Sequence, residues 1–145
     1  MRGVNFEKIF FHDWEKWSHR QIPSHDLDVP EGFGIYGIYI LGSFFGGPDE
    51  MVFDPKNIPE EVFYIGMSRH VDQRLAKSHT AVMSYRDATG DHSCQNLWYV
   101  KASSEWSGNS YTSGPLAGSY IEFYERALIL QYVITHKKLP AHNKH

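Results

Sequence analysis

Residues 62–68 of this sequence read VFYIGMS, and residues 33–41 read FGIYGIYIL. Both stretches are rich in aromatic and β-branched side chains, which favour strands over helices. The Gly- and Pro-rich segment between them, residues 42–61, is long enough to be an insertion rather than a tight turn. A third strand is expected at residues 97–103, LWYVKAS. The sequence therefore predicts a small sheet whose first two strands form an antiparallel pair.

Helices are expected before the first of these strands and after the second. Residues 5–19 carry apolar side chains at roughly helical spacing, which predicts a short amphipathic helix at the N-terminus. Ser68 can cap a second helix, whose apolar stripe includes Val71, Leu75 and Val82. Together with the strands, these segments predict helices packed on a small sheet.

The last helix is expected to begin at a capping box formed by Ser119 and Glu122. It is expected to end near Lys138, because Pro140 disfavours helical structure in the residue before it. The predicted fold is therefore an α+β fold, with a small antiparallel three-stranded sheet flanked by helices and an N-terminal helical extension.

The composition indicates one globular domain, with 145 residues, 41% hydrophobic and 15% aromatic. No apolar run is long enough to span a membrane, and the N-terminal segment lacks the pattern of a signal peptide. Cys94 is the only cysteine, which excludes an internal disulfide and fits a reducing compartment. We therefore expect a cytoplasmic protein, in a bacterium or a phage-infected host, with no membrane partner.

The charges divide unevenly along the chain. Residues 1–62 contain five Lys or Arg and eleven Asp or Glu side chains, whereas residues 63–145 contain nine and six. A polyanion would therefore meet the second half of the chain. The alternative is a protein surface that is unevenly charged but contacts only solvent.

Four short elements follow one another along the sequence. They are Gly34-Ile35-Tyr36, then Tyr64-Ile65-Gly66, then Arg74 ten residues after Tyr64, and finally a Pro-x-x-Asn stop that ends at Asn143. Each is common alone, but the ordered series resembles the GIY-YIG nuclease family. The resemblance runs from about residue 33 to residue 143. It implies an N-terminal extension at residues 1–30 and a GIY-YIG-like nuclease domain at residues 31–145.

By this resemblance, Tyr36 and Tyr64 are the tyrosines that face the catalytic site. A phenol there can position or deprotonate the attacking water, or donate a hydrogen bond. Because a phenol has an ordinary pKa of about 10, action as a base requires a nearby cation. Each ring could instead serve only to pack a strand. We assign Tyr39 to packing.

Arg74 matches the arginine that the family carries on the helix after its second motif. Its guanidinium group can bind two phosphate oxygens at once. His79, five residues later, could act as acid or base, although the family usually places this residue four positions after the arginine. Asn143 either orients catalytic groups or stabilises the turn after Pro140.

The family's metal ligand is a glutamate in the last helix, twelve residues before the asparagine. Counting back from Asn143 leads to Gln131. The resemblance implies Mg²⁺, or Mn²⁺ in its place, as cofactor, and Mg²⁺ prefers charged oxygen ligands. The amide at residue 131 is therefore either a natural weakening of the site or an engineered inactivation. Neither Glu122 nor Glu125 shares the helix face of residue 131, given 3.6 residues per turn.

The resemblance implies a metal-dependent DNA endonuclease, of a restriction or phage type, that is impaired by Gln131. Double-stranded DNA is the expected partner, and a homodimer would suit a cut through both strands. The expected DNA contacts are Ser68, Arg69, His70 and Lys77. The alternative is a nucleic-acid-binding protein that keeps the scaffold without cleaving.

Overall fold

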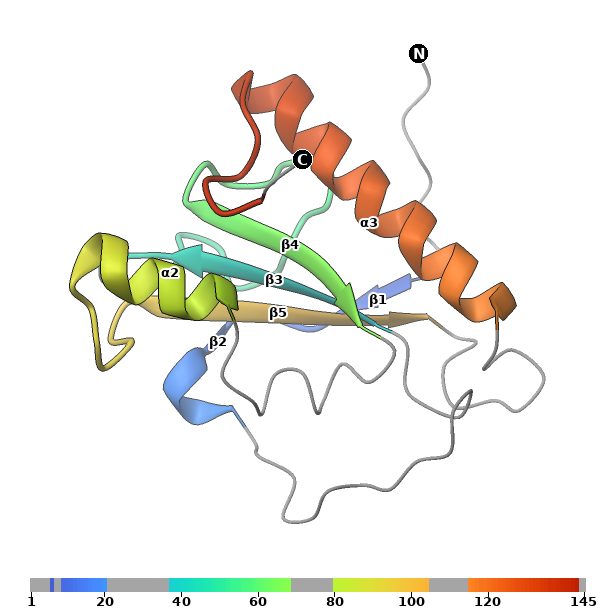
Figure 1. Ribbon diagram of the computed structural model, residues 1–145. Coiled ribbons are helices and arrows are strands. Elements are labelled where there is room, and N and C mark those ends of the chain that lie inside the picture. The colour runs from blue at the N-terminus through green and yellow to red at the C-terminus, as the bar shows by residue number, and fades with distance from the viewer. Residues whose placement is uncertain (1–5, 7–8, 21–36, 69–79, 105–114, 144–145) are drawn as a thin grey trace.

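The described residues of the computed structural model, 6, 9–20, 37–68, 80–104 and 115–143, form an α+β fold around one antiparallel sheet (Figure 1). The expected fold class is thus confirmed. The sheet has five strands rather than the expected three, in the order β1-β5-β3-β4, with β2 also paired to β5. The strands are β1 (Ile9–Phe11), β2 (Glu15–Lys16), β3 (Gly37–Ser43), β4 (Val62–Ser68) and β5 (Leu97–Ser104).

The two additional strands come from the segment that the sequence predicted as an N-terminal helix, so that prediction is wrong. Ile9 pairs with Ser104, and Glu15 pairs with Tyr99, which extends the sheet beyond β5. In the described part of this segment, residues 6 and 9–19, the only helical residues are Trp17–His19, which form a single 3-10 turn labelled η1. The spacing of aromatic residues suited a helix, but pairing with the open edge of β5 satisfies the main-chain hydrogen bonds of this segment instead.

The β3–β4 hairpin contains a bulge. Tyr39 lies opposite Gly66 and Leu41 opposite Tyr64, but the next pair is Gly42 with Val62, so Phe63 is the extra residue. The bulge turns the rings of Phe63 and Tyr64 toward the same layer of side chains. It therefore decides which face of the sheet receives the tyrosine of the Tyr-Ile-Gly motif.

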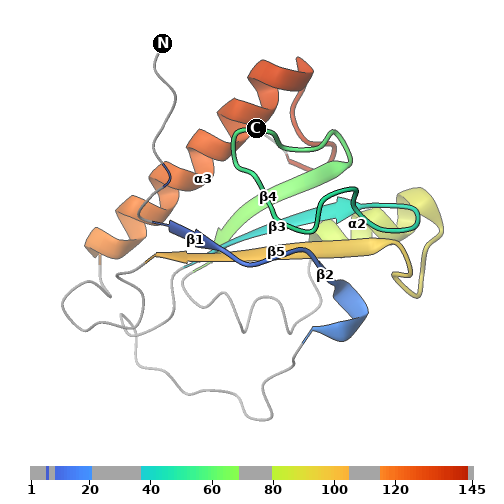
Figure 2. The same ribbon diagram turned by 180° about the vertical axis from the view of Figure 1, so that it is seen from behind.

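Two helices cover opposite faces of the sheet (Figures 1 and 2). Helix α3 (Pro115–His136) packs its buried residues on one face, against Ile38, Ile65 and Val100 of the sheet. Helix α2 (Thr80–Thr89) packs on the other face, where Tyr85 stacks on Phe63 with ring centroids 5.0 Å apart. The residues of α3 that contribute to the first layer are Ile121, Tyr124, Leu128 and Tyr132.

Helix α3 begins four residues before the predicted capping box. Its first residue is Pro115, whose fixed φ angle and missing N–H suit the first turn of a helix. Ser119 therefore lies within the helix, and Glu122 forms an ion pair of 3.2 Å with Arg126 instead of capping. The helix ends at His136, and Lys137 follows with a φ of 61° in the left-handed region that often terminates helices.

Several sequence predictions concern residues outside the described ranges. These are the first Gly-Ile-Tyr motif with Tyr36, the domain boundary at residue 30, and the start of the helix expected after Ser68. The basic and histidine residues assigned to catalysis and DNA contact also lie there, namely Arg69, His70, Arg74, Lys77 and His79. Among the residues that are described, no helix is long and apolar enough to cross a membrane.

Candidate functional site

The Tyr-Ile-Gly strand presents its tyrosine as one half of a stacked pair. The rings of Tyr39 and Tyr64 lie 5.6 Å apart between centroids, at an interplanar angle of 21°. Gly66 makes this stack possible, because a Cβ atom there would lie 2.5 Å from the ring of Tyr64 and 2.8 Å from that of Tyr39. Tyr39 is buried, as its assignment to packing requires, whereas Tyr64 is partly exposed.

Tyr85 of α2 belongs to the layer of side chains against which Tyr64 packs. The Tyr85 hydroxyl donates a hydrogen bond to the Asp91 carboxylate and accepts one of 3.4 Å from Ser43. Burial, together with the bond to Asp91, raises the pKa of Tyr85 to about 12. Tyr85 therefore stays protonated at neutral pH and serves as a structural donor rather than a base.

The C-terminal segment docks on the exposed edge of β4. The side-chain amide of Asn143 accepts a hydrogen bond from the Ile65 N–H and donates one to the Ile65 carbonyl, both at 2.9 Å. One residue earlier, the His142 N–H donates to the Phe63 carbonyl at 2.8 Å. The segment after Pro140 thus pairs with β4 as a short additional strand would. The Asn143 N–H also donates to the Pro140 carbonyl at 2.9 Å, so Asn143 both closes the turn after Pro140 and contacts the Tyr-Ile-Gly strand.

Gln131 lies on a different part of the molecule. Its Nε2 atom donates to the Lys56 carbonyl at 3.4 Å. Two further side chains of α3 bind the same loop, since the Tyr132 hydroxyl donates to the Glu60 carbonyl at 2.8 Å and the His136 ring nitrogen lies 2.7 Å from the Ile58 carbonyl. The C-terminal half of α3 therefore holds the loop between β3 and β4 through alternate carbonyl groups. A glutamate at residue 131 could not donate such a bond.

The sheet separates Gln131 from Tyr64. Helix α3 packs on the face that carries Ile38 and Ile65, whereas Tyr64 contributes to the layer beneath α2. The structure thus brings Tyr64 and Asn143 together through Ile65, but it does not bring Gln131 to them. Ser68 lies at the far end of β4, opposite Gly37.

Glu125 is the carboxylate of α3 that lies against β4, and the sequence reasoning did not select it. It is half-buried, and its carboxyl group is hydrogen-bonded by the main chain of Met67. Burial raises the pKa of Glu125, and this exceeds the lowering effects of Arg126 and the Met67 hydrogen bond. One indication of this contact was present in the sequence: Glu125 lies next to Tyr124 and three residues before Leu128, which are both buried.

The donor set of the described residues does not fit a divalent metal site. Among these residues, no group of three or more His, Cys, Asp or Glu side chains is arranged to hold an ion. Gln131 offers a neutral oxygen, and its nitrogen is directed to the Lys56 carbonyl. A single uncharged ligand is a poor substitute for the carboxylates that Mg²⁺ prefers.

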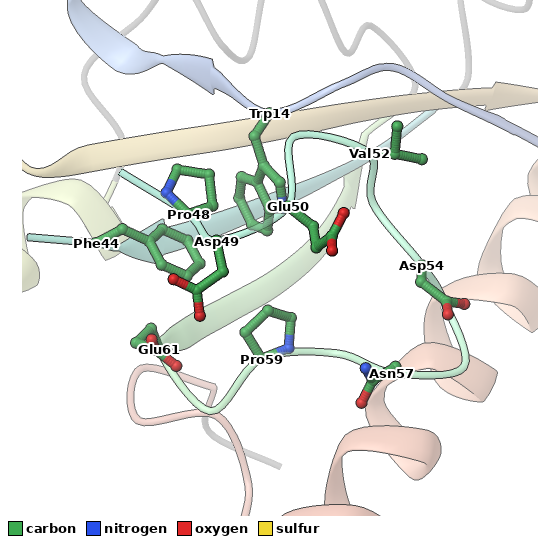
Figure 3. Close-up of a pocket in the computed structure, with 10 residues that line it drawn as sticks. All are labelled: Trp14, Phe44, Pro48, Asp49, Glu50, Val52, Asp54, Asn57, Pro59 and Glu61. Carbon is green, nitrogen blue, oxygen red and sulfur yellow. The ribbon is translucent and has the colours of Figure 1, made fainter. Parts of the chain in front are cut away.

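A cavity of about 570 Å³ lies beside the loop between β3 and β4 (Figure 3). Figure 3 shows the rings of Trp14 and Phe44 near the carboxylates of Asp49 and Glu50. Among the described residues that line it there is no Lys or Arg, and the carboxylates there disfavour a phosphate backbone. The residues that line the cavity are Trp14, Phe44, Pro48, Asp49, Glu50, Val52, Asp54, Asn57, Pro59 and Glu61.

The fold and the docked C-terminal segment define an α+β protein with a β-hairpin of stacked tyrosines. Comparisons of this chain with protein-family models, with curated proteins and with solved structures find no match.

Proposed function

We propose that this chain is a DNA-directed phosphodiesterase of the GIY-YIG type, whose cleavage is weakened by the amide at residue 131. The proposal is supported by the pairing of Asn143 with Ile65, in which two motifs distant in sequence meet in one structural unit. A chance series of short motifs gives no reason for such contact. The partial exposure of Tyr64 at this unit is compatible with access of a phosphodiester group.

In this proposal, Tyr64 supplies a hydroxyl group to the reacting phosphate or water. Its stack on Tyr39 and the absence of a side chain at Gly66 fix the plane of the ring. Asn143 acts as a positioning residue, because its amide holds the main chain beside Tyr64. Arg74 and Tyr36 complete the phosphate site by resemblance to the family. The described residues do not by themselves fit a metal ion, so the role proposed for residue 131 rests on the resemblance to the family's glutamate, and no step is assigned to Mg²⁺ or Mn²⁺.

A second candidate function is nucleic-acid binding without cleavage. It is favoured by the hydrogen bond from Gln131 to Lys56, which gives the amide a structural use that a catalytic carboxylate would lack. Under this alternative, residue 131 holds the β3–β4 loop, and the scaffold retains affinity for the backbone of the nucleic acid.

Cleavage of supercoiled plasmid, duplex, branched and single-stranded DNA in Mg²⁺ tests the first function. The chain is compared with Gln131→Glu and with Gln95→Glu, which makes the same change at an exposed loop position. We expect strong cutting from Gln131→Glu alone, and a loss of about 10²-fold or more when Tyr64→Phe is added. Cutting by Gln95→Glu to the same extent would contradict the assigned role of residue 131.

DNA binding separates the remaining outcomes. Under the nuclease proposal, the chain and Gln131→Glu both bind duplex DNA, and the affinity falls steeply as salt increases. If both bind but Gln131→Glu cuts none of the substrates, the non-cleaving alternative is correct. If neither shows salt-sensitive binding, both functions are wrong.

A further inference from the structure

Helix α3 carries a second apolar face that points away from the sheet. Tyr120, Phe123, Leu130 and Ile134 are 40–54% exposed, and Ala127, midway between them, is partly exposed. These five residues, named here the α3 outer stripe, recur at intervals of three, four, three and four. This spacing aligns them along one side of the helix, and it is the spacing of the contact seam in paired helices.

An apolar face of this length is unusual on the solvent side of a helix that already packs on a sheet. Surface helices normally carry polar side chains opposite their buried face. Contiguous exposed apolar side chains mark interaction surfaces more often than isolated ones do. The even 3-4 spacing points to another helix as the occupant.

We propose that the α3 outer stripe pairs antiparallel with the same stripe of a second copy of this chain. The stripe is nearly symmetric about Ala127, with Tyr120 and Ile134 each seven residues from it. A two-fold axis at Ala127 places Tyr120 against Ile134 of the second copy and Phe123 against Leu130 of the second copy. Such reciprocal contacts are the mark of an isologous interface. The small side chain at the axis allows the helices to approach closely.

The helix dipoles of α3 favour the antiparallel direction. The charged side chains of Glu122 and Lys138 already have ion-pair partners within the chain, Arg126 and Glu60. Antiparallel pairing opposes the two helix dipoles, whereas parallel pairing would align them.

The area of the stripe predicts a weak dimer. Each of its four large side chains exposes roughly 100 Å², if a fully exposed aromatic or aliphatic residue has about 200 Å². With flanking polar residues, the two copies together would bury about 1,000–1,200 Å², at the lower limit for specific interfaces. We therefore expect a dissociation constant in the micromolar range rather than a permanent dimer.

Sedimentation velocity measures this association directly. From about 1 to 300 µM, a range that brackets micromolar affinity, we expect the full chain to shift from monomer to dimer. Leu130→Glu should remain monomeric throughout. Phe45→Glu is the matched control, because Phe45 is 96% exposed but lies on the β3–β4 loop. It should dimerise like the unchanged chain. A monomeric unchanged chain at 300 µM, or dimerisation of Leu130→Glu, would overturn the proposal.

Oxidative cross-linking tests the direction and the axis. Cys94 is buried and is the only native cysteine, so the unchanged chain provides the background. Ala127→Cys should form a covalent dimer, since each residue 127 meets its counterpart at the axis within disulfide reach. Leu130→Cys should not, because its counterpart lies about 9 Å along the helix at 1.5 Å per residue. Cross-linking of both variants would indicate parallel pairing, and cross-linking of neither would place the interface elsewhere.

Discussion

The side-chain amide of Asn143 forms two hydrogen bonds of 2.9 Å with the main chain of Ile65, 78 residues earlier in the sequence. The amide thereby matches the donor and acceptor pattern that a neighbouring strand would offer to the edge of β4. Together with the hydrogen bond from the His142 N–H to the Phe63 carbonyl, this side chain fixes the C-terminal segment to the strand that carries Tyr64.

Asn143→Ala should therefore lower the free energy of unfolding by about 1–3 kcal/mol, because it leaves the Ile65 N–H and carbonyl without their protein partner. Asn143→Asp should also destabilise the fold, since a carboxylate can accept from the N–H but repels the carbonyl oxygen. Urea denaturation followed by fluorescence measures both. Asn57→Ala, at an exposed loop position, is the control and should change stability little. Equal effects of Asn143→Ala and Asn57→Ala would show that the two hydrogen bonds contribute nothing.

The sequence predicted β4 and β5 almost residue for residue, because their apolar and aromatic patterns are local signals. It failed at residues 9–16, where helical spacing of a few aromatic residues was outweighed by pairing with distant β5. Of the candidate site, it placed Tyr64 and Asn143 in one ordered series. It could not give their contact through Ile65, because a hydrogen bond across 78 residues has no local pattern.

The same limit applies to Gln131 and Glu125. Helical periodicity fixes the angle between them, but which of the two meets β4 depends on how α3 crosses the sheet. The position of the β3–β4 loop decides the partner of Gln131. Both contacts depend on tertiary structure, which the sequence pattern does not give. The sequence alone therefore pointed to residue 131 and not to Glu125.

Gly66→Ala should destabilise the hairpin by about 1–3 kcal/mol, the usual cost of overpacking a close-packed site. The added methyl group would lie 2.5 Å from the Tyr64 ring and 2.8 Å from the Tyr39 ring, so the stack must open. In a Tyr64→Ala background the same substitution should cost less, because one of the two clashing rings is gone. Thermal unfolding of the four chains of this double-mutant cycle measures the coupling. Strict additivity would contradict the proposed steric role of Gly66.

Gln131→Glu should change stability by less than about 0.5 kcal/mol, because its hydrogen bond to Lys56 is long, at 3.4 Å, and solvent-accessible. Tyr132→Phe removes a shorter bond of 2.8 Å to the Glu60 carbonyl from a buried ring, and it should cost about 1 kcal/mol. Chemical denaturation compares the two. A stable Gln131→Glu chain also means that its activity can be interpreted without correction for unfolding. A larger loss of stability for Gln131→Glu than for Tyr132→Phe would mean that the hydrogen bond to Lys56 contributes more than the one to Glu60.

Glu125 should make the stability of the fold depend on pH. Burial raises the pKa of its carboxyl group above the value of about 4.5 that it has in an unfolded chain. Between the unfolded and the folded pKa, the folded chain binds more protons than the unfolded chain. The free energy of unfolding therefore falls as pH rises through this interval.

Glu125→Gln removes this titration while it keeps an oxygen that can accept from the Met67 main chain. The melting temperature of the variant should exceed that of the unchanged chain at pH 7, and the difference should shrink toward zero near pH 4, below both pKa values of the carboxyl group. Glu50→Gln, at an exposed loop position, should show no such trend. Melting temperatures of the three chains, measured between about pH 4 and pH 7, test this prediction. A variant that melts lower at pH 7, by a difference that disappears as the pH falls, would mean that the Glu125 carboxylate stabilises the contact with β4 in its charged form.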